Sequence, residues 1–271
     1  MKTGINEFFF DDGQLYYVYV PFNILKDPRN GKPLISVHGY NGIKDNQIGR
    51  KRVRRAAERW AHLADSNGWV VISPHFDQKR FNNDYQRLNV LGIRSDVRLN
   101  QIITEVERKL AGLRTDKLLF FGFSGGGQFV HRYAAFNPSR IERAVVASAG
   151  WYLWPDTTLP YPIGIEQNSL KHLPNPQILK LCQLNLLILV GEHDDEQGAF
   201  RRKIKSHNLT AIQGEGRRFR AENWIGSLKQ FSKLGDIDFK ITFKIVPNTG
   251  HSISKKLKKL AGKYLTDNGS F

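Results

Sequence analysis

The chain has 271 residues, 40% of them hydrophobic and 24% charged, with a formal net charge of +16. This size and balance fit a globular protein with a large core, most simply one α/β domain, although the length alone would also allow two. A single cysteine, Cys182, excludes an intrachain disulfide, and no apolar stretch approaches the ~20 residues of a membrane-spanning helix.

The basic residues gather in clusters that are dispersed along the chain: Arg50–Arg55, Arg201–Lys203, Arg217–Arg220 and Lys255–Lys259. Such charge can attract nucleic acid, anionic lipid or acidic substrates. No recognised nucleic-acid motif accompanies the clusters, so we interpret them as solvated helix faces and expect no specific nucleic-acid partner. The first twelve residues hold no apolar segment of signal-peptide length, and we expect a cytoplasmic protein.

Short apolar strands alternate with amphipathic helices along the chain, without an internal repeat or a low-complexity tract. Strands are predicted at residues 7–10, 15–20, 34–37, 69–72, 118–121, 144–147, 184–190 and 239–246. Helical spacing is found at residues 53–66, 93–110, 127–135, 217–234 and 252–265. We expect a long loop at 75–91 and an insertion rich in Trp, Tyr and Pro at 150–176. The alternation predicts a mostly parallel sheet with helices on both faces.

The chain is organised around Gly122–Gly126, which has the pattern G-x-S-x-G. The strand-forming run Lys117–Phe121 precedes it, and the helical run Gly127–Ala135 follows it. Strand, G-x-S-x-G and helix in this order are typical of a nucleophile elbow, where small neighbours let a strained turn expose a serine hydroxyl. Ser124 is therefore the candidate nucleophile, and the alternative interpretation is an ordinary Gly-rich turn.

A serine nucleophile needs a base, and the base needs an orienting acid. The acidic pair Asp194 and Asp195 follows strand 184–190, and His251 follows strand 239–246. Ligands of parallel sheets bind at the carboxyl ends of the strands, where these residues lie. The chain order is thus serine, acid and histidine, each after a different strand. His193 and His207 are weaker candidates for the base, because no strand delivers His207 and His193 adjoins the acid itself.

Taken together, Gly122–Gly126, Gly191–Asp194 and Gly250–His251 resemble the elbow, acid turn and histidine loop of the α/β-hydrolase superfamily. The resemblance extends from about Leu15 to the end of the chain. It implies an α/β-hydrolase fold, with a mostly parallel twisted sheet, helices on both faces and a small insertion between strands. It also implies one domain over residues 1–271, with 150–176 as a lid or pocket, and it favours Asp194 over Asp195.

The same resemblance implies an oxyanion hole and a substrate pocket. His38-Gly39-Tyr40 is similar to the H-G-x turn of esterases, so the N–H groups of Tyr40 and Gly125 are the expected oxyanion donors, with His38 bracing the loop. In the insertion, Trp151, Tyr152 and Trp154 are candidate substrate-binding residues, and packing of the insertion onto the core is the alternative.

We therefore expect a serine hydrolase that cleaves a small-molecule carboxylic ester through an acyl-enzyme. The segments Gly125–Ala135 and Gly150–Tyr152 resemble polyhydroxybutyrate-depolymerase-like and feruloyl-esterase-like enzymes. No histidine–carboxylate cluster has metal-ligand spacing, so no metal or cofactor is expected. A thioesterase or small-peptide hydrolase would use the same residues. A non-catalytic protein that binds nucleic acid or a membrane surface on a hydrolase scaffold is the alternative of another class.

Overall fold

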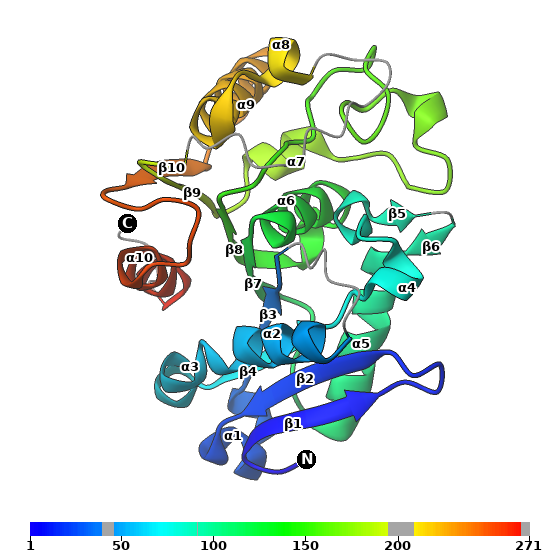
Figure 1. Cartoon of the computed structure of the whole chain (residues 1–271), viewed down its shortest axis with the longest axis vertical. Helices are drawn as coiled ribbons and strands as arrows, with labels where there is room; N and C mark the ends of the chain where they lie inside the picture. The colour runs from blue at the N-terminus through cyan, green and yellow to red at the C-terminus, as the bar shows by residue number, and fades with distance from the viewer. Residues whose placement is uncertain (40–45, 91, 195–208, 267–271) are drawn as a thin grey trace.

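The computed structural model describes residues 1–39, 46–90, 92–194 and 209–266. Its main sheet has the order β1-β2-β4-β3-β7-β8-β9-β10 (Figure 1). Those strands are β1 (Gly4–Phe9), β2 (Leu15–Val20), β3 (Lys32–Val37), β4 (Trp69–Pro74), β7 (Leu118–Phe123), β8 (Ile141–Ala147), β9 (Leu186–Gly191) and β10 (Thr242–Val246). The first two strands pair antiparallel with each other and β2 pairs antiparallel with β4, whereas all further pairs are parallel.

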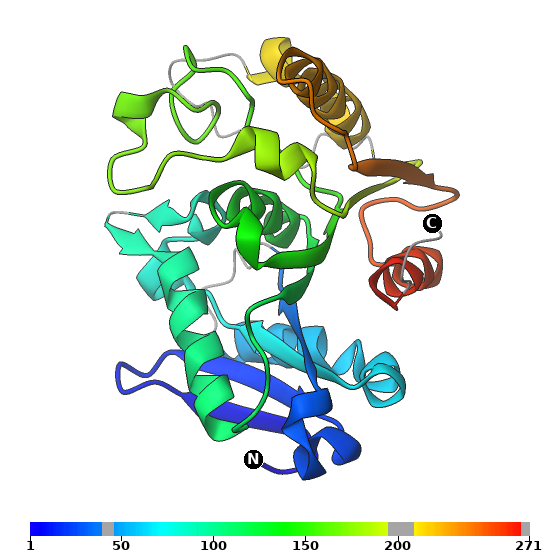
Figure 2. The ribbon, with the colours of Figure 1, turned by 180° about the vertical axis from the view of Figure 1, so that it is seen from behind.

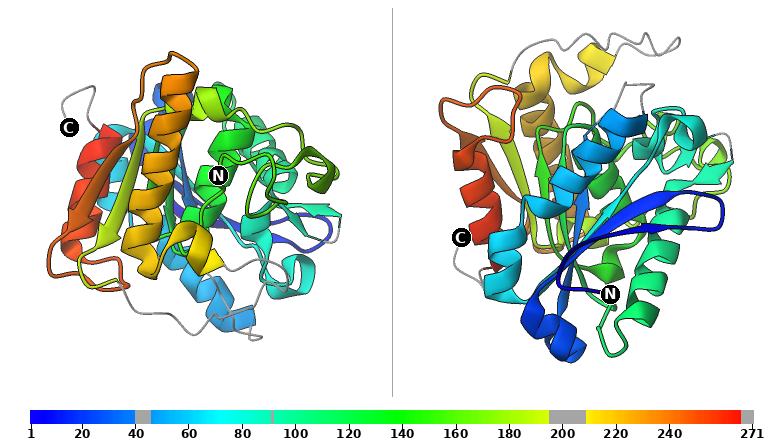
Figure 3. Two further views of the ribbon diagram at one scale, coloured as in Figure 1. Left: turned by 90° about the horizontal axis from the view of Figure 1, so that it is seen from above. Right: turned by 60° about the horizontal axis from the view of Figure 1, so that its bottom comes forward.

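Helices cover both faces of this sheet. They are α1 (Phe22–Lys26), α2 (Asn46–Glu58), α3 (Ala61–Asn67), α4 (Gln78–Phe81), α5 (Ser95–Lys109), α6 (Gly125–Phe136), α7 (Ile178–Cys182), α8 (Leu209–Gln213), α9 (Gly216–Leu234) and α10 (Lys255–Thr266). In the right-hand view of Figure 3, α2, α3 and α10 lie on one side of the sheet and α5 on the other. Figure 2, the view from behind, shows α5 and α6 near each other in front of the strands.

The alternation of side chains along the central strands builds a core on each face. In β7, Leu118 and Phe120 pack into the cluster formed with α5, α6, α7 and α9. Leu119 and Phe121, between them in the sequence, pack into the cluster formed with α2, α3 and α10. Side chains alternate between the two faces of a strand, so a strand covered on both sides must be apolar at every position. This is why β7 has a continuous apolar run and not an alternating pattern.

The prediction of a mostly parallel, doubly covered sheet is confirmed, whereas several predicted element boundaries are wrong. The single helix predicted for 53–66 is two helices, α2 and α3, and Trp60 lies between them with its side chain fully buried. The backbone N–H of Trp60 donates to the carbonyl oxygen of Ala57, three residues back, so the α-helical pattern is interrupted there. The Trp60 ring packs edge-on against Phe121, with the ring centroids 4.9 Å apart. Apolar spacing continues through this break, so periodicity alone predicts one helix.

The stretch 75–91, predicted as a loop, contains short elements, namely α4, the 3₁₀ turn Tyr85–Arg87, and β5 (Asn89–Val90), which pairs with β6 (Ile93–Arg94). The last strand begins at Thr242 and not at residue 239. The backbone N–H of Lys240 donates to the carbonyl oxygen of Cys182 on α7, 2.9 Å away, and not to the neighbouring strand. Tertiary contacts of this kind have no signal in the local sequence.

The segment 150–176 leaves the carboxyl end of β8 and leads to α7, with the 3₁₀ turn Gln167–Ser169 as its only regular element among the described residues. Figure 1 shows it beside α8 and α9. It is fastened to α9 by the indole N–H of Trp224, which donates to the carbonyl oxygen of Leu153 at 2.7 Å. None of the helices that the structure describes has the length and hydropathy needed to cross a lipid bilayer.

Candidate active site

Three loops at the carboxyl ends of parallel strands carry the residues singled out in the sequence. Ser124 follows β7, Asp194 lies in the turn after β9, and His251 lies in the loop after β10. Since β7, β8, β9 and β10 are parallel, their carboxyl ends meet at one edge of the sheet. Ser124 and Asp194, 70 positions apart in the sequence, are brought together there with His251, which lies 57 positions after Asp194.

Ser124 adopts φ 56° and ψ −116°, a left-handed conformation that costs a non-glycine residue free energy. Its backbone is held on both sides: its N–H donates to the carbonyl oxygen of Ala147 at 2.8 Å, and its carbonyl accepts from the N–H of Gln128 at 3.0 Å. These two bonds link β8 and α6 to the turn, so the surrounding fold maintains the strained backbone.

The glycines around Ser124 allow a very close approach of backbone segments. A Cβ atom on Gly122 would lie 2.2 Å from the carbonyl oxygen of Gly126, and one on Gly126 would lie 2.3 Å from that of Val37. Both distances are far below van der Waals contact, so no side chain fits at either position. The steric reason for glycine at both ends of the G-x-S-x-G pattern is therefore present in the fold.

The side chains of Ser124, His251 and Asp194 form one hydrogen-bonded chain. Nε2 of His251 lies 3.1 Å from Oγ of Ser124, and Nδ1 of His251 lies 3.0 and 3.1 Å from the two carboxylate oxygens of Asp194. An ionised carboxylate only accepts, so the imidazole proton belongs on Nδ1, which leaves Nε2 to accept from the serine hydroxyl. The ring of Phe123 packs against the imidazole at a centroid distance of 4.8 Å.

The acid turn is tied to the histidine loop through the backbone. The N–H of His193 donates to the carbonyl oxygen of Thr249 at 2.9 Å, and a Cβ on Gly191 would lie 2.2 Å from that same oxygen. This contact places the fully buried Asp194 beside His251. The His193 side chain is 66% exposed and lies 3.8 Å from Glu192. Asp195 and His207 lie outside the described residues.

A cationic side chain from one of the basic clusters, that of Arg217, reaches the same carboxylate. Nη1 of Arg217, on the first turn of α9, donates to Oδ1 of Asp194 at 3.0 Å. The Arg217 side chain is only 13% exposed and that of Asp194 is 0% exposed. No spacing rule in the sequence connects the turn after β9 with the start of α9, so this ion pair had no sequence signal.

The loop after β3 lies against the serine. A Cβ on Gly39 would lie 3.7 Å from Cβ of Ser124. His38 is buried, its Nδ1 donates to the carbonyl oxygen of Gly39 at 2.7 Å, and its Nε2 accepts from the N–H of Phe76 at 3.1 Å. Burial, and secondarily the nearby His75, lowers the pKa of His38 to about 3. A neutral His38 therefore braces this loop.

Of the two expected oxyanion donors, Gly125 is described and Tyr40 lies outside the described residues. Gly125 is the first residue of α6, directly after Ser124. N–H groups in the first turn of a helix have no acceptor within the helix and carry the positive end of the helix dipole. The Gly125 N–H therefore lies at the positive end of the helix dipole, next to Ser124 in the chain.

The three aromatic residues proposed for substrate binding differ in their surroundings. Tyr152 is completely buried, with its ring stacked 4.6 Å from that of Trp224. Its side chain packs the core and is closed to solvent. Trp151 and Trp154 are partly exposed, and the guanidinium of Arg220 lies 3.6 Å from the centre of the Trp151 ring.

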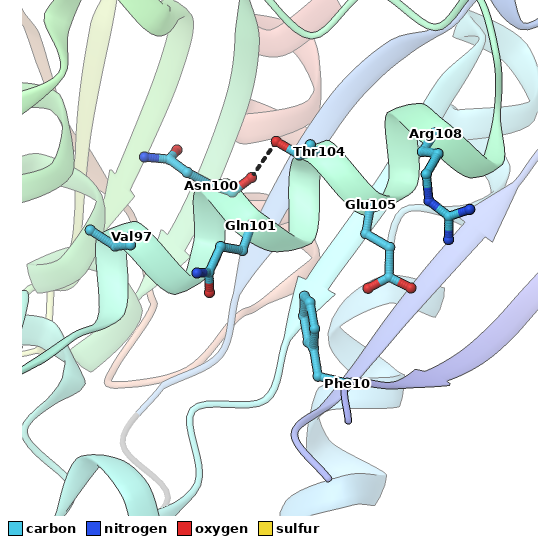
Figure 4. A pocket seen from close by; sticks show the side chains of 7 residues that line it. All are labelled: Phe10, Val97, Asn100, Gln101, Thr104, Glu105 and Arg108. Carbon is cyan, nitrogen blue, oxygen red and sulfur yellow. Dashed lines mark hydrogen bonds between the residues drawn. The ribbon is translucent and has the colours of Figure 1, made fainter. Parts of the chain in front are cut away.

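A separate shallow pocket of about 450 Å³ lies on the outer face of α5 (Figure 4). It is lined by Phe10, Val97, Asn100, Gln101, Thr104, Glu105 and Arg108. Figure 4 shows Phe10 facing the helix, on which the hydroxyl of Thr104 donates to the carbonyl oxygen of Asn100 at 3.1 Å. None of these residues belongs to the strand ends that carry Ser124, Asp194 and His251, so the pocket is not part of the candidate active site.

No protein-family model matches the sequence, and no curated protein matches it. Solved structures do resemble it. Poly(aspartic acid) hydrolase-1 from Sphingomonas sp. KT-1 is 20% identical with a TM-score of 0.77, and the match covers 98% of this chain and 100% of that one. A poly(3-hydroxybutyrate) depolymerase from Bordetella parapertussis is 19% identical with a TM-score of 0.76, covering 97% and 89%.

The chain has the α/β-hydrolase fold. An S-formylglutathione hydrolase from Agrobacterium tumefaciens shares it at 13% identity and a TM-score of 0.56, covering 97% of this chain and 91% of that one. The expectation of an α/β-hydrolase fold is therefore confirmed over nearly the whole chain. In such folds the nucleophile stands on the turn between strand and helix, where Ser124 lies here.

Proposed function

We propose that the protein is a serine hydrolase that cleaves carboxylic esters through an acyl-enzyme. The observation that carries this proposal is the continuous hydrogen-bonded chain from Ser124 through His251 to Asp194 at a strained strand-to-helix turn. Similarity to a solved poly(3-hydroxybutyrate) depolymerase and a solved S-formylglutathione hydrolase supports a hydrolytic reaction.

In the proposed mechanism, Oγ of Ser124 attacks the ester carbonyl carbon while Nε2 of His251 takes the hydroxyl proton. Asp194 holds the imidazole in the tautomer with the proton on Nδ1 and stabilises the imidazolium. When the tetrahedral intermediate collapses, the proton on Nε2 goes to the departing alkoxide and the alcohol leaves. A water molecule then attacks the acyl-enzyme by the same steps, releasing the acid and restoring Ser124.

The oxyanion of both tetrahedral intermediates is proposed to accept hydrogen bonds from the N–H groups of Gly125 and Tyr40. The support is the position of Gly125 at the start of α6 and the contact of Gly39 with Ser124. We propose that the chain forms one domain in which the segment 150–176 borders the substrate site, with Trp151 and Trp154 as contact residues. The cytoplasmic location expected from the sequence stays a prediction.

A fluorophosphonate probe tests the proposed nucleophile. One equivalent of probe per chain should be incorporated, at Ser124. The Ser124→Ala variant should not be labelled and should keep the melting temperature of the wild type. Stoichiometric labelling of another serine would transfer the role to that residue. Absence of labelling, combined with salt-sensitive binding of nucleic acid, would favour the non-catalytic alternative.

A second candidate function is hydrolysis of amide bonds in a polyanionic chain. Two observations favour it: the net charge of +16, and the similarity to a poly(aspartic acid) hydrolase. The same residues would act, with an amine as the leaving group. A panel of matched ester, thioester and amide substrates, each in neutral and carboxylate-bearing form, separates the candidates. If kcat/KM is at least tenfold higher for the carboxylate-bearing amides than for the matched esters, amide hydrolysis replaces ester hydrolysis as the proposed activity.

A further inference from the structure

The triad acid carries an ion pair that the mechanism above does not use. Oδ1 of Asp194 accepts from two donors at the same distance of 3.0 Å, Nδ1 of His251 and Nη1 of Arg217. A catalytic triad needs only the first of these bonds. The second comes from a different element, α9, and its donor is a guanidinium cation.

We propose that Arg217 is a positioning residue of this site, which holds the Asp194 carboxylate in place and shifts the working range of His251 toward lower pH. This inference rests on the proposed function, because it assigns a role within the same Ser124–His251–Asp194 chain.

The positioning role follows from the burial of the carboxylate. Asp194 is 0% exposed, so its oxygens are shielded from bulk solvent. Its backbone is held by a turn in which its N–H donates to the carbonyl oxygen of Gly191 at 3.1 Å. Among the described residues, the side-chain donors that reach this carboxylate are His251 and Arg217. Of these two described donors, Arg217 is the one that the carboxylate does not itself orient for catalysis.

The electrostatic role follows from the distances. Both nitrogen atoms lie 3.0 Å from Oδ1, so they are separated by no more than twice that distance. Asp194 favours protonation of His251, whereas a permanent cation this close opposes it. Because His251 must be unprotonated to accept the serine proton, Arg217 extends catalysis to more acidic conditions. At partly buried sites, a unit charge at this range displaces a titration by about one pH unit.

Among the residues that the structure describes, the other charged and titratable groups near Asp194 and His251 do not cancel this effect. Burial, with Asp194 as a further cause, raises the pKa of Tyr152, so this phenol stays neutral. Burial, and then Arg217, lowers the pKa of Arg220 to about 10, so Arg220 is a second cation on the same side. Glu192 and His193 lie 3.8 Å apart with side chains 44% and 66% exposed, so solvent screens part of their charge. Glu215 on the approach to α9, and Lys255 and Lys256 at the start of α10, are likewise exposed.

The test compares three variants. Arg217→Met removes the charge and the hydrogen bonds, and Arg217→Gln removes the charge but keeps an amide donor. Arg218→Met is the matched control, because Arg218 adjoins Arg217 on α9 but pairs with Glu222 at 3.0 Å and is 38% exposed. The rate of fluorophosphonate labelling is measured from about pH 5 to pH 9, where an acidic limb reports the base. This assay needs no knowledge of the natural substrate.

We expect the midpoint of the acidic limb to rise by about one pH unit in Arg217→Met and in Arg217→Gln. The plateau rate should fall about tenfold in Arg217→Met and less in Arg217→Gln, because the glutamine amide still orients the carboxylate. Arg218→Met should leave both quantities unchanged. A merely structural role of Arg217 would lower the melting temperature without moving the midpoint.

An unchanged midpoint in Arg217→Met, with a plateau within about twofold of the wild type, would overturn the proposal. If Arg217→Met does not fold, the midpoint of the acidic limb in Arg217→Gln decides between the two outcomes. Absence of labelling in the wild type would instead overturn the proposed function. In that case the NMR titration of the His251 imidazole in the wild type and in Arg217→Gln still decides whether Arg217 opposes its protonation.

Discussion

Replacing Gly126 with alanine tests whether close packing of backbone segments holds the nucleophile in place. Gly126 is the second residue of α6 and the last residue of the G-x-S-x-G pattern. A Cβ there would lie 2.3 Å from the carbonyl oxygen of Val37 and 2.8 Å from that of His38. Both are backbone atoms at the end of β3, so no side chain can rotate away to make room.

These distances set how far an alanine at position 126 would push α6 away from the loop after β3. An ordinary carbon–oxygen contact is about 3.3 Å, so α6 and the loop after β3 must separate by roughly 1 Å. Overpacking of this kind costs about 1–3 kcal/mol of stability, which lowers the Tm of a chain of this size by roughly 2–12 °C. Ser124 lies between the two displaced segments. A misplacement of about 1 Å can cost about 10²-fold in rate.

Gly226→Ala is the matched control, because a Cβ at Gly226 in the middle of α9 has no neighbouring atom within 4 Å. Alanine is the better helix former, so this variant should gain about 0.5–1 kcal/mol. Thermal unfolding measures the stability of both variants, and fluorophosphonate labelling measures the reactivity of the serine. If Gly126→Ala keeps the melting temperature and the labelling rate of the wild type, close packing at Gly126 does not hold the serine in place.

The remaining predictions concern the acid, the pocket, a buried histidine and the charge. Asp194→Asn should lower kcat by at least roughly 10², and Asp195→Asn by no more than about tenfold; the reverse ranking for one activated ester would transfer the role to Asp195. Trp151→Ala should change KM or acyl preference more than Tm, whereas a large loss of stability with unchanged selectivity would make Trp151 a packing residue. His38 takes up a proton near pH 6.5 in the unfolded chain but only at about pH 3 in the folded protein. The contribution of His38 to stability therefore falls as the pH drops between those values. An NMR titration midpoint of His38 above pH 5 would contradict a buried, neutral His38. Binding to DNA or RNA should be weak and largely lost near physiological salt, and sequence-selective binding that survives there would show that the basic surface is a specific site.

The fold class and the order of the site residues could be predicted because they depend on local patterns. Apolar runs such as the one in β7 must be buried on both faces, and their alternation with amphipathic helices leaves few topologies besides a parallel sheet. Gly122 is required by a contact within the strand-turn-helix unit, with the carbonyl oxygen of Gly126, whereas Gly126 is required by its contact with the end of β3. Those signals are present in the chain before it folds.

The sequence patterns therefore predict the layered α/β architecture, the elbow serine and the strand ends that carry the acid and the base. Which side chains touch in the folded protein depends on how these elements pack. The contact of the Asp194 carboxylate with His251, the complete burial of Tyr152 and the ion pair with Arg217 all join segments that are distant in the sequence. Such contacts depend on how separate elements pack against one another, and no periodicity or spacing within a single element encodes that packing.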